Sequence, residues 1–196
     1  MMKLLHVDSS ILGDQSVSRV LAAAIVQRLK KHNPALEVVH RDLVTRPLPH
    51  LTADDLLPAA PAVIGDGVLS EFLAADVIVI GVALYNLGVS SQLKAWIDRI
   101  VVPGRTFRYT PHGPEGLSKN KRVILAVTRG GNYRTSNALA PGEHAEAYLR
   151  SIFGFIGVTK LEVIAADGLA ISKEQKESSK QAAMNAISTL DICCKV

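Results

Sequence analysis

Five short runs of apolar residues are spaced along the chain and predict β-strands. The run Val77-Ile78-Val79-Ile80 is β-branched throughout and shows no polar alternation, which is typical of a strand covered on both faces. The first run contains Leu4, Leu5 and Val7 and ends at the polar residues that follow it. The complete set of predicted strands is 4–7, 36–39, 77–80, 123–127 and 161–165.

Between these runs, apolar residues recur every three or four positions, as they do along one face of a helix. The clearest such stripe is Val17, Val20, Leu21, Ala24, Ile25 and Leu29, with Ser16 well placed to cap the helix. Another helix, capped by Ser90 or Ser91, has an apolar face from Leu93 to Val101. Further helices are predicted at 143–155, at 172–190 and within 52–72, the last interrupted near Pro58 and Pro61.

Strands that alternate with helices predict an α/β fold with a parallel sheet and right-handed crossovers. Residues 103–118 are rich in glycine and proline and predict an excursion from this pattern, a short hairpin. The length of 196 residues is typical of one domain, so we expect residues 1–196 to form a single unit.

Composition excludes several classes of protein. A hydrophobic fraction of 48% is that of a globular protein and excludes wholesale disorder. The longest apolar run, 77–85, is too short to cross a membrane, and no signal peptide is apparent, so we expect a cytoplasmic protein without membrane contact. The adjacent cysteines, Cys193 and Cys194, do not suggest a disulfide framework.

Charge and residue spacing narrow the choice further. The net charge is +4, but the basic residues form no long run, and we expect no nucleic-acid partner. No spacing of histidine, aspartate or glutamate is typical of a metal site, so no metal is predicted. His6 lies within the first predicted strand and is interpreted as a core residue with a satisfied ring nitrogen.

In a parallel sheet, ligands bind beyond the carboxyl ends of the strands, so the loops after the strands are the places to search. The first loop carries Ser9, Ser10, Ser16 and Ser18 ahead of a helix. A helix N-terminus offers unpaired N–H groups and partial positive charge, which favour a phosphate. The alternative is that these serines only cap the helix and solvate a turn. Neither GxxxxGK[ST] nor GxGxxG occurs, which disfavours a P-loop or dinucleotide site and favours a flavodoxin-like mononucleotide site.

The second loop is Leu84-Tyr85-Asn86-Leu87-Gly88-Val89-Ser90. Its apolar and aromatic side chains suit a planar ring, and the Asn86 amide can both donate and accept hydrogen bonds at a flavin edge. The alternative is an ordinary strand-to-helix turn with Asn86 in a left-handed conformation.

The third loop is Thr128-Arg129-Gly130-Gly131-Asn132-Tyr133. Paired glycines let backbone N–H groups approach a ligand closely, and such donors would stabilise the negative charge of a reduced flavin. The alternative is a flexible turn. All three loops follow strands whose carboxyl ends are predicted to converge, which strengthens the case for one shared site.

Several stretches together resemble a known family. They are Ser9-Ser10-Ile11-Leu12 with Ser16 and Ser18, Tyr85-Asn86 ahead of Ser91-Gln92-Leu93-Lys94, Thr106-Phe107-Arg108-Tyr109-Thr110 with Gly113-Pro114-Glu115-Gly116-Leu117, Arg129-Gly130-Gly131, and Gly154-Phe155-Ile156-Gly157. In this order and spacing the chain resembles the FMN-dependent NADH azoreductases over nearly its whole length.

The resemblance implies a flavodoxin-like three-layer sandwich with strand order 2-1-3-4-5, and a homodimer with one FMN per subunit. It implies ping-pong transfer of hydride from NADH to FMN and then to quinones or azo dyes. Ser10, Ser16, Val17 and Ser18 would hold the FMN phosphate; Leu84, Tyr85, Asn86 and Leu87 would line the ring and ribityl chain; Thr128, Arg129, Gly130 and Gly131 would close over the pyrimidine edge. Tyr109, Ile152 and Phe153 would form part of the acceptor pocket.

Two rival functions remain open from the sequence. A flavodoxin-type FMN electron carrier would have no substrate of its own, but such carriers are usually acidic and this chain is basic. A hydrolase using a loop serine would lack the usual G-x-S-x-G elbow. For the reductase, we hypothesise that Tyr133 or an ordered water donates the proton that completes reduction of the acceptor.

Overall fold

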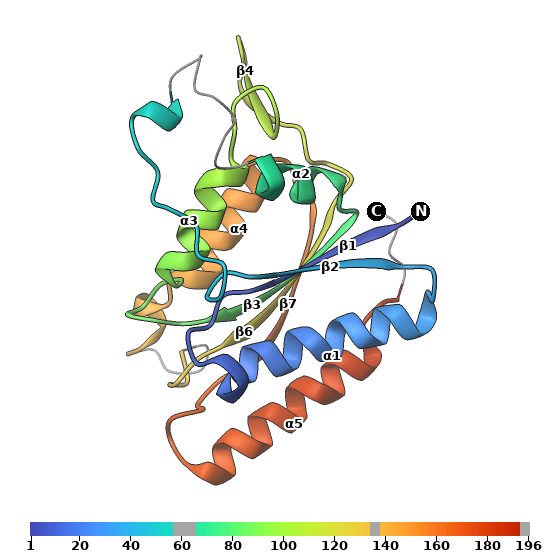
Figure 1. The fold of residues 1–196 in the computed structure, drawn as a ribbon. Coiled ribbons are helices and arrows are strands. Elements are labelled where there is room, and N and C mark those ends of the chain that lie inside the picture. Colours follow the sequence, from blue (N-terminus) through green and yellow to red (C-terminus); the bar gives the residue numbers. More distant parts are fainter. Residues whose placement is uncertain (57–65, 134–137, 193–196) are drawn as a thin grey trace.

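A parallel sheet lies at the centre of the protein in the computed structural model, which describes residues 1–56, 66–133 and 138–192 (Figure 1). Its five strands stand in the order β2-β1-β3-β6-β7. They are β1 (Lys3–Asp8), β2 (Glu37–Asp42), β3 (Val77–Ala83), β6 (Arg122–Thr128) and β7 (Lys160–Ala166). The predicted α/β class and five-stranded parallel sheet are therefore confirmed.

Helices cover both faces of this sheet, which gives three layers (Figure 1). The helices on one face are α1 (Val17–His32) and α5 (Lys173–Thr189). Those on the other are α2 (Asp66–Ala74), α3 (Ser91–Ile100) and α4 (Ala145–Phe155). Short 3-10 turns occur at Gly13–Gln15, Asp54–Leu56 and Ala140–Gly142.

Alternation along the strands divides the core into two apolar clusters. In β3, Val77 and Val79 pack beneath α1 and α5, while Ile78 and Ile80 pack beneath α2, α3 and α4. All four of these side chains are fully buried. The continuous apolar run in the sequence is explained by this burial on both faces.

The predicted strand order 2-1-3-4-5 differs from the observed order in numbering. A hairpin formed by β4 (Phe107–Thr110) and β5 (Gly113–Gly116) precedes the fourth strand of the sheet and takes two numbers. This hairpin confirms the predicted excursion within 103–118. It packs against α4 through the rings of Phe107 and Phe155, whose centroids are 4.7 Å apart.

The predicted helix starts are also confirmed. Ser16 caps α1 by accepting a hydrogen bond from the backbone N–H of Arg19, and Ser90 caps α3 by accepting one from Leu93. The predicted break near Pro58 and Pro61, like Cys193 and Cys194, lies outside the described residues. None of the described helices has the length and apolar character needed to cross a membrane.

Candidate active site

The loop after β1 is held rigidly by hydrogen bonds to its neighbours. The Ser9 hydroxyl donates to the carbonyl of Gly81 at 2.7 Å, and the Ser90 hydroxyl donates to the carbonyl of Ser9 at 3.0 Å. Both contacts are buried. Ser9, the first serine of this loop, thus serves to fix the loop.

The three loops singled out in the sequence converge at the carboxyl edge of the sheet. The hydroxyls of Ser10 and Tyr85 lie 3.0 Å apart, and the backbone N–H of Leu84 donates to the carbonyl of Thr128 at 2.9 Å. A cavity of about 240 Å³ opens where they meet. Its lining is Ser10, Leu12, Gln15, Ser16, Val17, Ala83, Leu84, Tyr85, Thr128, Arg129, Gly130, Leu169, Ala170 and Lys176.

Some residues proposed for cofactor binding lie beside this cavity instead of on its surface. Ser18 is fully buried, and its hydroxyl lies 3.0 Å from that of Ser16. Asn86, Leu87 and Gly131 continue the lining loops, and Tyr133 lies against Gly131.

The residues proposed for the acceptor pocket are spread over two elements. Tyr109 is 75% exposed and lies on β4 of the hairpin. Ile152 is half-buried on α4, and Phe153 is fully buried in the apolar cluster beneath that helix. The structure therefore gives Phe153 a packing role in its own chain and leaves Tyr109 free to contact another molecule.

Sequence reasoning missed a fourth contributor to the cavity. Leu169, Ala170 and Lys176 come from the loop after β7 and the first turn of α5. Lys176 and Arg129 are the cationic residues in the lining, and because Arg129 is already paired with three carboxylates, Lys176 is the one that suits an anionic ligand. This loop also follows a strand of the parallel sheet, and the same rule that selected the other three loops would have found it.

The turn at Asn86 and Leu87 is strained. Both residues have positive φ, at 46° and 68°, and the backbones of Tyr85 and Gly88 exchange hydrogen bonds across the turn. Asn86 tolerates this conformation, but a left-handed leucine costs on the order of 1–2 kcal/mol. Strain of this kind is often stored next to a functional site, as here beside the cavity.

Ion pairs of the buried Arg129 side chain hold the third loop in place. The guanidinium is fully buried and donates to Glu143 at 3.2 Å, to Asp167 at 2.9 Å and to Glu146 at 2.7 Å. The pKa of Arg129 is lowered by burial, but its bonds to Asp167 and Glu146 outweigh this and leave the pKa raised. The side chain therefore ties the loop to α4 and to the loop after β7.

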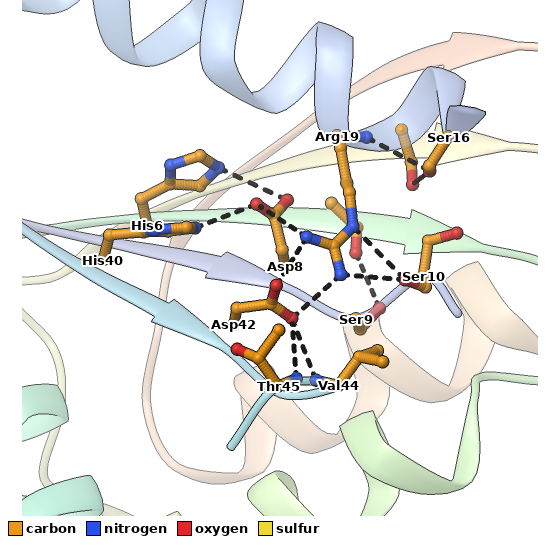
Figure 2. Close-up of polar contacts among 12 residues, drawn as sticks. His6, Asp8, Ser9, Ser10, Ser16, Arg19, His40, Asp42, Val44 and Thr45 are labelled. Carbon is orange, nitrogen blue, oxygen red and sulfur yellow. Dashed lines mark hydrogen bonds and ion pairs between the residues drawn. The ribbon is translucent and has the colours of Figure 1, made fainter. Parts of the chain in front are cut away.

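A second ion-pair network, centred on Arg19 and Asp42, fixes the first loop (Figure 2). Arg19 on α1 donates to both carboxylate oxygens of Asp42 at 2.7 and 2.8 Å, and also to the carbonyl of Ser10. The Arg19 guanidinium, with smaller contributions from the backbone N–H groups of Val44 and Thr45, lowers the pKa of Asp42 from 3.8 to about 2.

We expect Asp42→Asn to lower the free energy of unfolding by about 1–2 kcal/mol at pH 7. Asp42 has a depressed pKa in the folded state, so its contribution is present above pH 3.8 and is lost as the pH falls towards 2. The difference from the parent should shrink over that range in urea titrations. Asp98→Asn, which removes a more exposed pair with Lys94, is the control and should cost less than about 0.5 kcal/mol. Equal losses in the two variants would contradict this assignment.

Comparison with known proteins agrees with the geometry. A family model described as the flavodoxin-like fold matches residues 2–190. The chain belongs to this family. Within it, the chain is 52% identical to FMN-dependent NADH:quinone oxidoreductase 2 of Bradyrhizobium diazoefficiens over 199 residues, which cover 96% of this chain and 98% of that one. It is likewise 52% identical over 200 residues to an FMN-dependent NADH:quinone oxidoreductase of Methylorubrum extorquens, with the same coverage.

Solved structures of azoreductases are similar to this chain over nearly its whole length. An azoreductase from Bacillus anthracis strain Sterne superposes with a TM-score of 0.88 at 31% identity, covering 96% of this chain and 97% of that one. An FMN-dependent NADH-azoreductase from Bacillus anthracis strain Ames Ancestor, in complex with FMN, shares the fold with a TM-score of 0.82 at 23% identity. The resemblance seen in the sequence is therefore confirmed.

Proposed function

We propose that this protein is an FMN-dependent NADH:quinone oxidoreductase that also reduces aromatic azo compounds. The observation that carries the proposal is the cavity at the carboxyl edge of the sheet, formed by the N-terminus of α1, the loops after β1, β3, β6 and β7, and the first turn of α5. Relatives at 52% identity over nearly the full chain carry the quinone oxidoreductase name. Whole-length similarity of this degree makes a shared cofactor and reaction the simplest interpretation.

The residues around the cavity fit FMN. Ser10, Ser16 and the first N–H groups of α1 offer donors to a phosphate, and Lys176 adds a positive charge. Leu84 and Tyr85 offer an apolar and aromatic surface to a planar ring, and the exposed Gly130 lets the ligand approach the backbone. The lining thus offers donors and a positive charge to an anion, and an apolar, aromatic surface to a planar ring. FMN has both an anionic phosphate and a planar ring.

The chain itself supplies binding and orientation. Bound FMN would supply the hydride-transfer chemistry between NADH and the acceptor. The loops that line the cavity would fix the positions of donor and acceptor against the ring. An azo bond takes four electrons and four protons to become two amines, so each azo bond consumes two NADH. Tyr133, the last residue of the third loop, stays our candidate for a proton donor.

We also propose a homodimer in which the second subunit completes the active site. The cavity of about 240 Å³ is smaller than the roughly 300–1,000 Å³ of typical ligand pockets, and it is open to solvent. Tyr109 projects from the hairpin at 75% exposure and does not line the cavity of its own chain. Completion by a partner accounts for both features.

The rival function is that of an electron carrier. Purified protein loaded with FMN should oxidise NADH continuously when menadione or methyl red is added, with one NADH per quinone and two per azo bond. A carrier would bind FMN but show no sustained NADH oxidation with either acceptor, and that result would overturn the proposal.

A serine hydrolase is disfavoured because the hydroxyls of Ser10 and Ser16 contact Tyr85 and Ser18, which are not bases.

A further inference from the structure

Three side chains that could ligate a metal meet on the α1 side of the sheet, outside the flavin cavity. His6 and Asp8 are two residues apart on β1 and so point to the same face. His40 lies directly opposite His6 in the register of β1 and β2. One nitrogen of each ring and one oxygen of the carboxylate all lie within 4.8 Å of one another. Figure 2 shows both rings directed at the Asp8 carboxylate.

Two atoms in this cluster are buried without a hydrogen-bond partner. They are Nε2 of His6 and Oδ1 of Asp8, on residues that are 8% and 4% exposed. They face each other at 3.4 Å, which is the distance of an ion pair when His6 is protonated, but their geometry is not that of a well-formed hydrogen bond. Leaving a buried polar atom without a partner costs about 1–3 kcal/mol, so two such atoms in contact call for an explanation.

A metal ion would account for both contacts at once, whereas protons would have to occupy them separately. One proton lies between His40 Nε2 and Asp8 Oδ2, which are 2.9 Å apart, and a second, on His6 Nε2, would have to bridge the longer 3.4 Å separation from Asp8 Oδ1. Two ligands held at about 2.0–2.1 Å from a tetrahedral ion are about 3.3–3.4 Å apart, which is the separation of His6 Nε2 and Asp8 Oδ1. An ion at this position would ligate both orphaned atoms at once.

The charge around the cluster also suits a cation. Arg19 approaches Asp8 Oδ2 to 3.8 Å, but its guanidinium is paired on two sides with Asp42. Asp8 and Asp42 together with Arg19 therefore carry a net charge of −1 when the histidines are neutral. The His40 side chain is 51% exposed, so an ion can enter from solvent, and water can take the remaining position.

We propose that His6, Asp8 and His40 form a binding site for a borderline divalent metal ion of the zinc class. Two imidazoles and one carboxylate are the ligands that zinc prefers, whereas magnesium and calcium prefer oxygen alone. The site does not line the flavin cavity and does not depend on the proposed function. Asp8 directly precedes Ser9, so the site adjoins the start of the first loop of the candidate active site.

The test is zinc binding by the full-length, tag-free protein, used as purified without added FMN, with Cys193 and Cys194 changed to serine, so that thiols do not compete. Titration calorimetry should show one Zn²⁺ per chain, and Mg²⁺ at the same concentration should not compete. His40→Gln, at an exposed position, should weaken binding at least about 10-fold. His32→Gln on α1, whose ring bonds the carbonyl of Arg28, is the matched control and should leave the affinity unchanged.

Two further measurements keep the result decisive. Asp8→Asn should also weaken Zn²⁺ binding, and X-ray absorption of the zinc complex should show nitrogen and oxygen ligands with two imidazoles. Absence of stoichiometric binding would overturn the proposal. So would equal affinities in His40→Gln and His32→Gln, because the zinc would then be adventitious. Effective competition by Mg²⁺ would overturn the assigned class of ion.

Discussion

Arg129→Met is expected to lower the free energy of unfolding by about 3–5 kcal/mol at pH 7. The Arg129 side chain is fully buried and pairs with Glu143, Glu146 and Asp167, so its replacement removes a shared positive charge from three largely buried carboxylates. Methionine fills much of the same volume, which separates the loss of charge from the loss of packing. Chemical denaturation followed by circular dichroism measures the change.

The pH dependence of this variant has a defined sign. Burial raises the pKa of Glu146, but hydrogen bonds from Arg150 and Arg129 outweigh it and hold the pKa below its ordinary value of 4.5. In the parent protein this contribution is present above pH 4.5 and is lost as the pH falls. In the variant, the effect of burial on Glu146 is opposed less strongly, and burial favours the protonated acid. The difference in free energy of unfolding between parent and variant should therefore narrow as the pH falls below about 4.5.

Arg150→Met provides the control for Arg129→Met. Arg150 also pairs with Glu146, at 2.8 Å, but its side chain is 50% exposed. Its loss should cost less than about 1 kcal/mol, as is usual for exposed pairs. If the two variants unfold with the same free energy, the assignment of Arg129 as the anchor of the third loop is wrong.

Ser16→Asp is expected to weaken FMN binding at least about 100-fold while leaving the free protein as stable as before. Aspartate is as good a helix cap as serine, and its charge suits the N-terminus of α1. The same charge would face the FMN phosphate, and like charges at about 4 Å repel by up to about 4 kcal/mol near a protein surface. Quenching of flavin fluorescence during titration of the apoprotein measures the affinity.

Ser16→Asn is the matched control, because asparagine has the size and capping ability of aspartate without the charge. It should weaken FMN binding about 10-fold or less, the loss of one hydrogen bond. Equal FMN affinities in the Asp and Asn variants would show that the phosphate does not lie at the N-terminus of α1.

Local patterns were sufficient to predict most of the fold. The β-branched run at residues 77–80 is fully buried, as its pattern indicates. The stripe from Val17 to Leu29 is buried at Leu21, Ile25 and Leu29, although Val20 within it is exposed. Ser16 was recognisable as a helix cap because it bonds a neighbour only three residues away. The rule that ligands bind beyond the carboxyl ends of parallel strands then located the cavity from its loops. These inferences depend on contacts within one element or on a general rule of topology.

Features that depend on long-range register were not predictable in this way. The strand predicted at 36–39 is observed as Glu37–Asp42, because an edge strand carries polar residues such as His40 and Asp42 that hide its end. The cluster of His6, Asp8 and His40 is invisible as a sequence spacing, since it requires β1 and β2 to pair in one register. Likewise, nothing local to Arg129 predicts partners at Glu143, Glu146 and Asp167.

The central claim is that this chain takes electrons from NADH through bound FMN and delivers them to a quinone. The most direct test mixes the FMN-loaded protein anaerobically with one equivalent of NADH and then with one equivalent of menadione, while visible absorbance is recorded. We predict that the absorbance of oxidised flavin is lost on addition of NADH and returns on addition of menadione. Flavin absorbance that excess NADH leaves unchanged would contradict the account.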